Sequence, residues 1–142
     1  MARPGLSRAI AAFALLALPA RAATLEVAVL NVRNADGDVR VAVCSADTFL
    51  KDNCPYSGIA PARTGEVVVR IAGVPPGVWA VQAFHDEDRN GEVNRNLLGV
   101  PTEGIGFSND APFRFGPPTF TDAAFQFGPA GGRNRLSLRY LF

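Results

Sequence analysis

Hydrophobic and polar residues alternate along most of the chain after residue 22, which is typical of β-strands that bury one face. This two-residue period predicts six strand segments, at residues 24–32, 39–43, 66–72, 78–85, 119–127 (a strand or edge segment) and 134–142. Turns that contain glycine, proline, asparagine or aspartate separate these segments. Short strands with such turns indicate an all-β fold of the sandwich type.

The segments between the predicted strands differ in length and character. Residues 34–38 combine Asn, Asp and Gly, which favour tight turns, so the first two strands are expected to form a hairpin. Residues 45–64 lack a clear period and are predicted to be a long connection with one short helical turn at 46–50. In the predicted strand 78–85 neither face is polar throughout, which indicates a central position in its sheet.

Residues 86–118 are predicted to be mostly loop, because glycines and prolines recur through them without a strand period. A loop of this length within a small domain is more often functional than idle. Functional residues are therefore expected in this segment.

The first 22 residues combine a basic beginning, an apolar run over 9–18 and an A-x-A sequence that ends at Ala22, as secretory signal peptides do. The apolar run has about ten residues, whereas a membrane-spanning helix needs about 20. The sequence therefore predicts cleavage between Ala22 and Ala23 and export to the periplasm or the medium. The mature protein would be one domain over 23–142.

Charge and composition narrow the range of partners. The chain has 14 Lys and Arg residues against 13 Asp and Glu residues, and three of the arginines lie in the predicted signal segment. A mature domain with a net charge of −2 and one lysine is not expected to bind nucleic acid. No later apolar stretch is long enough to be a transmembrane segment, and the sequence leaves the oligomeric state open.

Cys44 and Cys54 are the two cysteines of the chain, with nine residues between them. Paired cysteines of exported proteins usually form disulfides, so a structural bridge is expected here. The C-x-x-C spacing of redox-active pairs is absent.

An acidic segment at residues 86–94 carries the strongest sign of chemistry. Its oxygen-bearing side chains stand at alternate positions, as in a loop that wraps around one calcium ion. The matching residues are Asp86, Asp88 and Asn90 at positions 1, 3 and 5, Gly91 at the turn, and Asn94 at position 9. Glu92 at position 7 could contribute its backbone carbonyl. Leu97 replaces the bidentate Glu of position 12, so Glu103 or Asp110 would have to complete the shell. The sequence thus predicts either a weak Ca²⁺ site or a polar turn without an ion.

Other residues near this segment are candidates for ligand binding: His85, Phe107, Ser108 and Asn109. The single histidine could act as a general base or metal ligand, or could fix the turn by bonding to its backbone. A zinc site is not expected, because there is no second His and no free thiol. Ser108 lies outside a G-x-S-x-G motif, so no catalytic residue is assigned. The late phenylalanines would either stack on sugars or fill the core.

Several short motifs are spread over the chain: PPGVWAV at 75–81, FHDED at 84–88, NG at 90–91, LGVPTEG at 98–104, GFSN at 106–109, PPTF at 117–120 and DAA at 122–124. This combination of motifs resembles a bacterial family of exported proteins, domain of unknown function 2141. The resemblance implies an exported protein of about this length without an assigned activity.

The motif at 75–81 is also similar, more loosely, to transthyretin-like and carboxypeptidase-regulatory-like sandwiches. That similarity implies a single antiparallel Greek-key sandwich of about seven strands. It implies no hydrolytic role, because the histidine-rich motifs of the transthyretin-like enzymes are absent.

Three functions remain open from the sequence. The first is a non-enzymatic module whose loop 86–118 binds an unknown small ligand or an envelope partner, with Ca²⁺ as the candidate cofactor. The second is a periplasmic hydrolase that uses His85 with Glu103 or Asp110. The third is a purely structural envelope protein.

Overall fold

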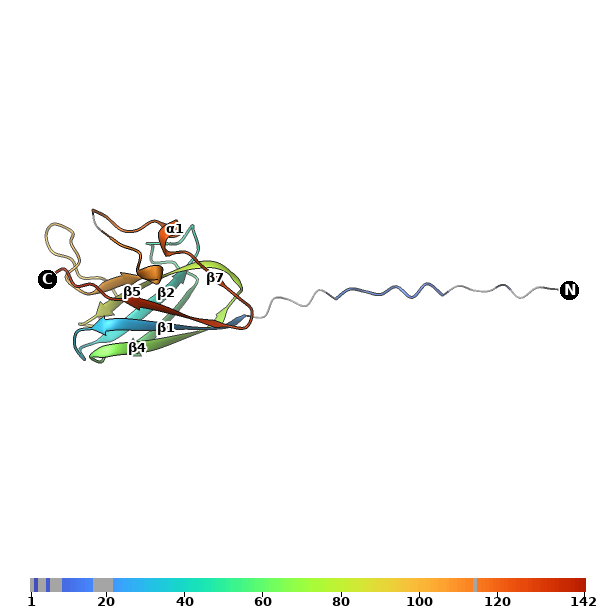
Figure 1. Ribbon diagram of the computed structural model, residues 1–142, viewed down its shortest axis with the longest axis horizontal. Coiled ribbons are helices and arrows are strands. Elements are labelled where there is room, and N and C mark those ends of the chain that lie inside the picture. The colour runs from blue at the N-terminus through green and yellow to red at the C-terminus, as the bar shows by residue number, and fades with distance from the viewer. Residues whose placement is uncertain (1, 3–4, 6–8, 17–21, 114) are drawn as a thin grey trace.

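The computed structural model describes residues 2, 5, 9–16, 22–113 and 115–142. The described residues hold eight strands, one 3₁₀ turn and one short helix (Figure 1). The elements are β1 (Ala23–Val32), β2 (Asp38–Cys44), β3 (Tyr56–Pro61), β4 (Gly65–Val74), β5 (Gly77–Asp86), β6 (Ile105–Phe107), the 3₁₀ turn η1 (Ser108–Asp110), α1 (Phe120–Ala123), β7 (Phe125–Phe127) and β8 (Gly132–Ser137).

Part of the predicted signal segment lies outside the described residues, including its arginines and residues 19–20. The described residues before β1 have no regular secondary structure. Among the described residues, no helix has the length and hydrophobicity needed to cross a membrane.

The strands form two sheets, so the prediction of an all-β fold is confirmed. One sheet has the order β4-β1-β8 and the other the order β3-β2-β5-β6. The second side of β5 is shared, because β7 pairs with its first residues and β6 with residues 82–84. The predicted central position of this strand is therefore correct. One pair, β1 with β8, is parallel, whereas antiparallel pairing was expected, and the transthyretin-like Greek key stays a prediction.

The predicted hairpin of the first two strands is wrong. β1 pairs with β4 and β8, whereas β2 pairs with β3 and β5, so residues 33–37 cross from one sheet to the other. Gly37 allows the crossing, since it has φ of +69° and lies so close to Asp86 that a Cβ would overlap the Asp86 carbonyl. Alternation identifies the buried face of a strand, but it does not say on which side of the core the strand lies.

Branched aliphatic side chains from both sheets fill the space between them. The inward residues of β1 and β2 alternate with outward ones, as the sequence predicts. Trp79 packs against this core, donates its indole N–H to the Pro75 carbonyl at 2.8 Å and meets the Tyr56 ring edge-on. The fully buried members include Leu25, Val27, Val29, Val39, Val43, Val74, Val81, Leu136 and Leu138.

Four other segments differ from expectation. Residues 56–61 form β3 within the predicted connection, whose mixed side chains hide the strand period. The expected strand 119–127 begins instead as α1, because Thr119 and Asp122 form a capping box, and only its last residues are β7. The last strand ends at Ser137, after which Arg139 pairs with Ile105 of the other sheet. At 46–50 a hydrogen-bonded turn stands where one helical turn was predicted.

A second, smaller apolar cluster covers only one end of the outer face of the five-stranded sheet. The connections over 45–54 and 108–124 supply it, and the Cys44–Cys54 disulfide holds the first of them on the sheet. The cluster consists of Cys44, Phe49, Ala80, Phe107, Ala111 and Ala123. The other end of that sheet face has no such cover, and the candidate site lies at this end.

Candidate functional site

The acidic segment begins at the buried end of β5, where Asp86 is fully shielded from solvent. One oxygen of Asp86 accepts Arg40 Nε–H at 2.6 Å and the Gly91 N–H at 2.9 Å, and the other accepts the Asn90 N–H at 3.1 Å. Burial raises the pKa of Asp86, but the Gly91 N–H and the Arg40 guanidinium outweigh it, so the pKa lies below its usual 3.8. Asp86 is therefore a charged anchor for the loop.

Three carboxylates converge in this loop. Asp86, Asp88 and Glu103 each present an oxygen within 4.8 Å of the others, two of them from buried side chains and Asp88 from an exposed one. Asn94 bridges them, since its Nδ2 lies 2.8 Å from Asp88 Oδ2 and 3.3 Å from Glu103 Oε1. Oxygen ligands at this spacing suit a hard cation such as Ca²⁺.

Glu103 reaches the cluster because the residues between the acidic loop and Glu103 form a tight hairpin. The Thr102 N–H donates to the Asn94 carbonyl at 2.8 Å, and residues 95–101 form a small hairpin beyond this pair. Glu103 then accepts the backbone N–H groups of Glu87 and Asn94, both at 3.1 Å. The carboxylate that sequence spacing would put at position 97 is thus supplied six residues later.

The charge state of Glu103 reflects its crowded surroundings. Burial raises its pKa, the two backbone N–H groups lower it, and the nearby Asp88 and Asp86 raise it again, with a net pKa above the usual 4.5. A divalent cation among these oxygens would remove the repulsion. The same backbone donors also satisfy the carboxylates in a turn that holds no ion, so both sequence alternatives fit the hydrogen bonds.

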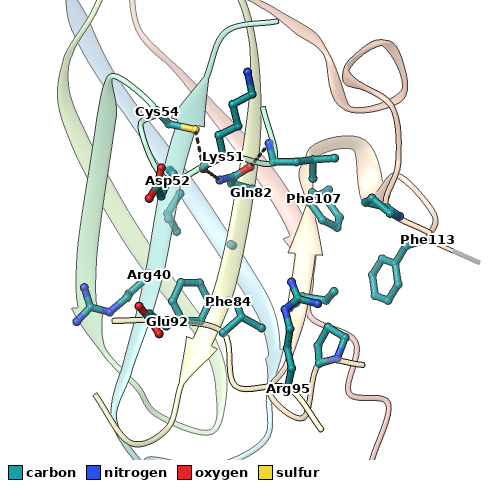
Figure 2. Close-up of a pocket in the computed structure, with 18 of the residues that line it drawn as sticks. Arg40, Lys51, Asp52, Cys54, Gln82, Phe84, Glu92, Arg95, Phe107 and Phe113 are labelled. Carbon is teal, nitrogen blue, oxygen red and sulfur yellow. Dashed lines mark hydrogen bonds between the residues drawn. The ribbon is translucent and has the colours of Figure 1, made fainter. Parts of the chain in front are cut away.

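Two other candidates lie at the edge of the cluster or outside it. The Glu92 N–H donates to Asn90 Oδ1 at 3.0 Å, which keeps the Glu92 backbone in the loop, and the ligand role expected of its backbone carbonyl stays a prediction. The Glu92 carboxylate lies with Arg40 and Phe84 at the groove described below (Figure 2). Asp110 accepts the Ser137 N–H at 2.7 Å and is outside the carboxylate cluster. Of the two carboxylates proposed to complete the shell, the structure brings in Glu103.

His85 faces the core between the sheets, where it is fully buried. Its Nε2 lies 2.6 Å from the Asp36 carbonyl, which only accepts, so Nε2 carries the proton. Its Nδ1 then accepts from the Tyr140 hydroxyl at 3.0 Å, and the Tyr140 oxygen accepts the Arg33 N–H at 3.0 Å. His85 is thus bonded to the turn through Asp36 and to Tyr140, and the hydrogen bonds of the described residues give it neither Glu103 nor Asp110 as a partner.

Ser108 and Asn109 hold the segment around α1 on the sheet. The buried Ser108 hydroxyl donates to the Ala123 carbonyl at 2.5 Å and accepts the Val81 N–H at 2.9 Å. The Asn109 side-chain amide donates to the carbonyls of Asp122 and Ala124, at 3.2 and 2.9 Å. Neither residue lines the groove, so the role predicted for them in ligand binding has no geometric support.

An open groove of about 1010 Å³ occupies the uncovered end of the five-stranded sheet (Figure 2). Outward residues of β2 and β5 form its floor, including Ala42, Gln82 and Phe84. Its walls come from the segments 50–54 and 91–101 and from Ile105, Phe113 and residues 115–117, and the candidate Phe107 lies among them. Gln82 fixes one wall, because its side chain accepts the Leu50 N–H at 2.8 Å and donates to the Lys51 carbonyl at 2.9 Å.

Sequence reasoning did not find this groove, although one sign of it was present. The outward face of 78–85 carries Phe84 beside polar Gln82, which is unusual for a face left to water. Only the tertiary structure shows that three separate segments rise around these residues.

Comparison with known proteins adds one match. A model of a family described as "Uncharacterized protein conserved in bacteria" matches residues 27–134, which include the acidic loop and most of both sheets. No curated protein and no solved structure gives a significant match to the chain.

Proposed function

We propose that this chain, which belongs to the bacterial family of domain of unknown function 2141, is an exported, non-enzymatic binding module whose groove takes an apolar ligand. The groove carries the proposal. It is about 1010 Å³ in volume, and its floor combines Phe84 and Ala42 with the amide of Gln82. A concave site with apolar lining and a few polar groups is the usual form of a small-molecule site.

Export is supported at the junction between the predicted signal segment and the domain. β1 begins at Ala23, the residue that follows the predicted cleavage point, so the mature chain would enter the sheet at once. The Cys44–Cys54 disulfide fits an oxidising compartment.

Calcium is proposed as the cation of the acidic loop. Asp86, Asp88 and Glu103 supply carboxylate oxygens within 4.8 Å, and Asn90 and Asn94 stand beside them. Residues 91–101 continue from this cluster into the groove wall, so a bound ion would stiffen that wall. A hydrolytic function is not proposed, because the buried His85 has both ring nitrogens engaged.

The test uses 1-anilinonaphthalene-8-sulfonate, a fluorescent probe with an apolar body, titrated into the mature protein. We expect saturable binding at one site, and at least about tenfold weaker binding for Phe84→Ala, since a phenyl contact is lost. Val78→Ala is the matched control, because Val78 is also exposed on β5 but lies outside the groove. Equal binding by Phe84→Ala and the wild type, with both proteins folded, would refute the groove as the ligand site.

A further inference from the structure

Two leucines at the tip of the hairpin 95–101 stand free of the rest of the protein. Leu97 has a relative exposure of 105% and Leu98 of 87%, so both side chains are as accessible as in an extended chain. Isolated exposed leucines are common on protein surfaces, but two adjacent ones at a protruding tip are not explained by packing.

The exposure of these leucines is built into a well-bonded turn. Asn96 Oδ1 accepts the N–H groups of Leu98 and Val100, at 2.9 and 3.0 Å. The Asn96 N–H donates to the Val100 carbonyl at 2.9 Å, and the Gly99 N–H donates back to the Asn96 carbonyl at 3.0 Å. Because these bonds fix the backbone, the leucines cannot fold back onto the domain without breaking them.

Other exposed apolar side chains gather around the same groove. Of the eight large exposed hydrophobic residues in the described chain after residue 22, four line the groove, and Leu98 and Phe142 are next in sequence to residues that line it. The loop after β5 and the carboxyl terminus lie at the same end of the sandwich (Figure 1). The rim residues are Leu50, Ile59, Phe115 and Leu141, which line the groove, and Phe142, which follows Leu141.

The form of this rim argues against a protein partner with a rigid face. Stable protein interfaces bury about 800 Å² on each side and pack closely, whereas single side chains that project from separate loops offer no continuous flat area. Projecting side chains of this kind can enter a fluid layer, which adapts to them. The rim therefore suits a lipid surface better than a second copy of the chain.

Basic side chains accompany the apolar ones. Arg95 precedes the leucines and donates from Nη1 to the Gly99 carbonyl at 3.0 Å, so its charge is held at the hairpin. The Arg139 guanidinium lies 5.6 Å from the centre of the Phe113 ring at the groove wall. Arginine beside projecting leucines is the combination by which amphipathic elements bind phosphate head groups and acyl chains together.

We infer that the tip of the hairpin 95–101 docks this protein on a phospholipid surface, with Leu97 and Leu98 inserted below the head groups and Arg95 at their phosphates. The exposed acids Asp88 and Glu92 precede the hairpin in sequence, and Glu92 lines the groove. The inference goes beyond the proposed ligand groove and does not require that the groove be filled.

The first test is co-sedimentation of the mature protein with vesicles of phosphatidylglycerol and phosphatidylcholine in equal parts, at constant Ca²⁺. We expect the wild type to sediment with the vesicles, and the double variant Leu97→Asn, Leu98→Asn to bind at least about tenfold more weakly. Val78→Thr is the control, because it changes an exposed apolar residue away from the rim. Thermal melting confirms that each variant is folded.

The second test places a reporter in the tip. In Leu98→Trp, insertion shifts the tryptophan emission to the blue when vesicles are added, relative to the wild type with Trp79 alone. An unshifted emission, or equal sedimentation of the double variant and the wild type, overturns the inference. The inference is also overturned if the wild type does not bind vesicles but forms a dimer in sedimentation velocity, and if the double variant is a monomer.

These outcomes are separate from those of the dye titration. If the protein binds vesicles but not the dye, the docking of the hairpin tip is supported and the ligand groove is refuted. If it binds the dye but not vesicles, the ligand groove is supported and the docking is refuted.

Discussion

The backbone N–H of Asn94 donates to the Glu103 carboxylate at 3.1 Å, although nine positions separate the two residues. This bond ties the end of the acidic segment to a carboxylate beyond the hairpin. It brings a third carboxylate to an incomplete calcium-loop pattern, and it closes the base of the hairpin whose tip carries the exposed Leu97 and Leu98.

Calcium is expected to stabilise the mature protein. At a Ca²⁺ concentration ten times the dissociation constant, binding to the folded state alone contributes about 1.4 kcal/mol, which raises Tm by roughly 5 °C. Asp88→Asn should lose most of this increase, because it removes the charge of the exposed carboxylate while keeping its shape. Differential scanning calorimetry in Ca²⁺ and in chelator measures the effect.

The control for this prediction is Asp47→Asn, which neutralises an exposed acid outside the cluster and should keep the full Ca²⁺ response. A wild-type Tm that is the same in Ca²⁺ and in chelator would leave the acidic loop as a polar turn without an ion.

Arg40→Met is expected to destabilise the domain by about 3 kcal/mol, because it leaves the fully buried carboxylate of Asp86 without its cation. Urea denaturation measures the loss. The matched variant Arg70→Met breaks the exposed pair with Glu26 and should cost less than about 1 kcal/mol. If the two variants lose similar amounts of unfolding free energy, burial does not determine how much the Arg40–Asp86 pair stabilises the domain.

Alkaline pH is expected to weaken the fold through Tyr140. Burial raises the pKa of its phenol above the usual 10.0, the Arg33 N–H and charge lower it, and Glu87 raises it slightly. Because the folded state holds the proton more tightly than the unfolded state, this stability is present below pH 10 and is lost as the pH rises through the folded pKa.

The titration of phenolate absorbance should therefore show one late-ionising tyrosine, which Tyr140→Phe removes. The same variant breaks the hydrogen bond to His85, so its Tm should be lower at neutral pH but less sensitive to alkali. A wild-type titration without a tyrosine that ionises above pH 10 would contradict the assignment.

Loss of the disulfide is expected to cost about 2–3 kcal/mol, the entropy of closing a loop of this length. The double variant Cys44→Ser, Cys54→Ser should also weaken binding of the fluorescent probe, because the segment from 50 to 54 forms one wall of the groove. Urea denaturation and the dye titration measure the two effects, and a stable variant with unchanged dye binding would show that Gln82 alone holds that wall.

Much of the strand framework follows from local pattern. The alternation of apolar and other residues in β1 and β2 predicted their buried faces, because a strand in a two-layer protein has one face in the core and one outside. The pairing of Cys44 with Cys54 was equally accessible, since the chain has no other cysteine.

The candidate site was only partly predictable. The positions of Asp86, Asp88 and Asn90 came from their spacing, and Glu103 was one of two candidates for the missing ligand. The structure chose Glu103 over Asp110 through the hydrogen bonds of the hairpin between residues 94 and 102. Ser108 lies in a loop-like sequence and His85 at the end of a predicted strand, yet both are buried, because the 3₁₀ turn and strand β5 carry them against the core.

The sequence by itself determined which residues face the core and which residues cross-link, because these depend on local period and on composition. The tertiary structure alone decided that β1 and β2 lie in opposite sheets, that Glu103 joins the acidic segment, and that a groove opens over Phe84. Each of these depends on contacts between residues far apart in the chain. A local pattern is compatible with several such arrangements, and their relative free energies are set by packing that involves the whole domain.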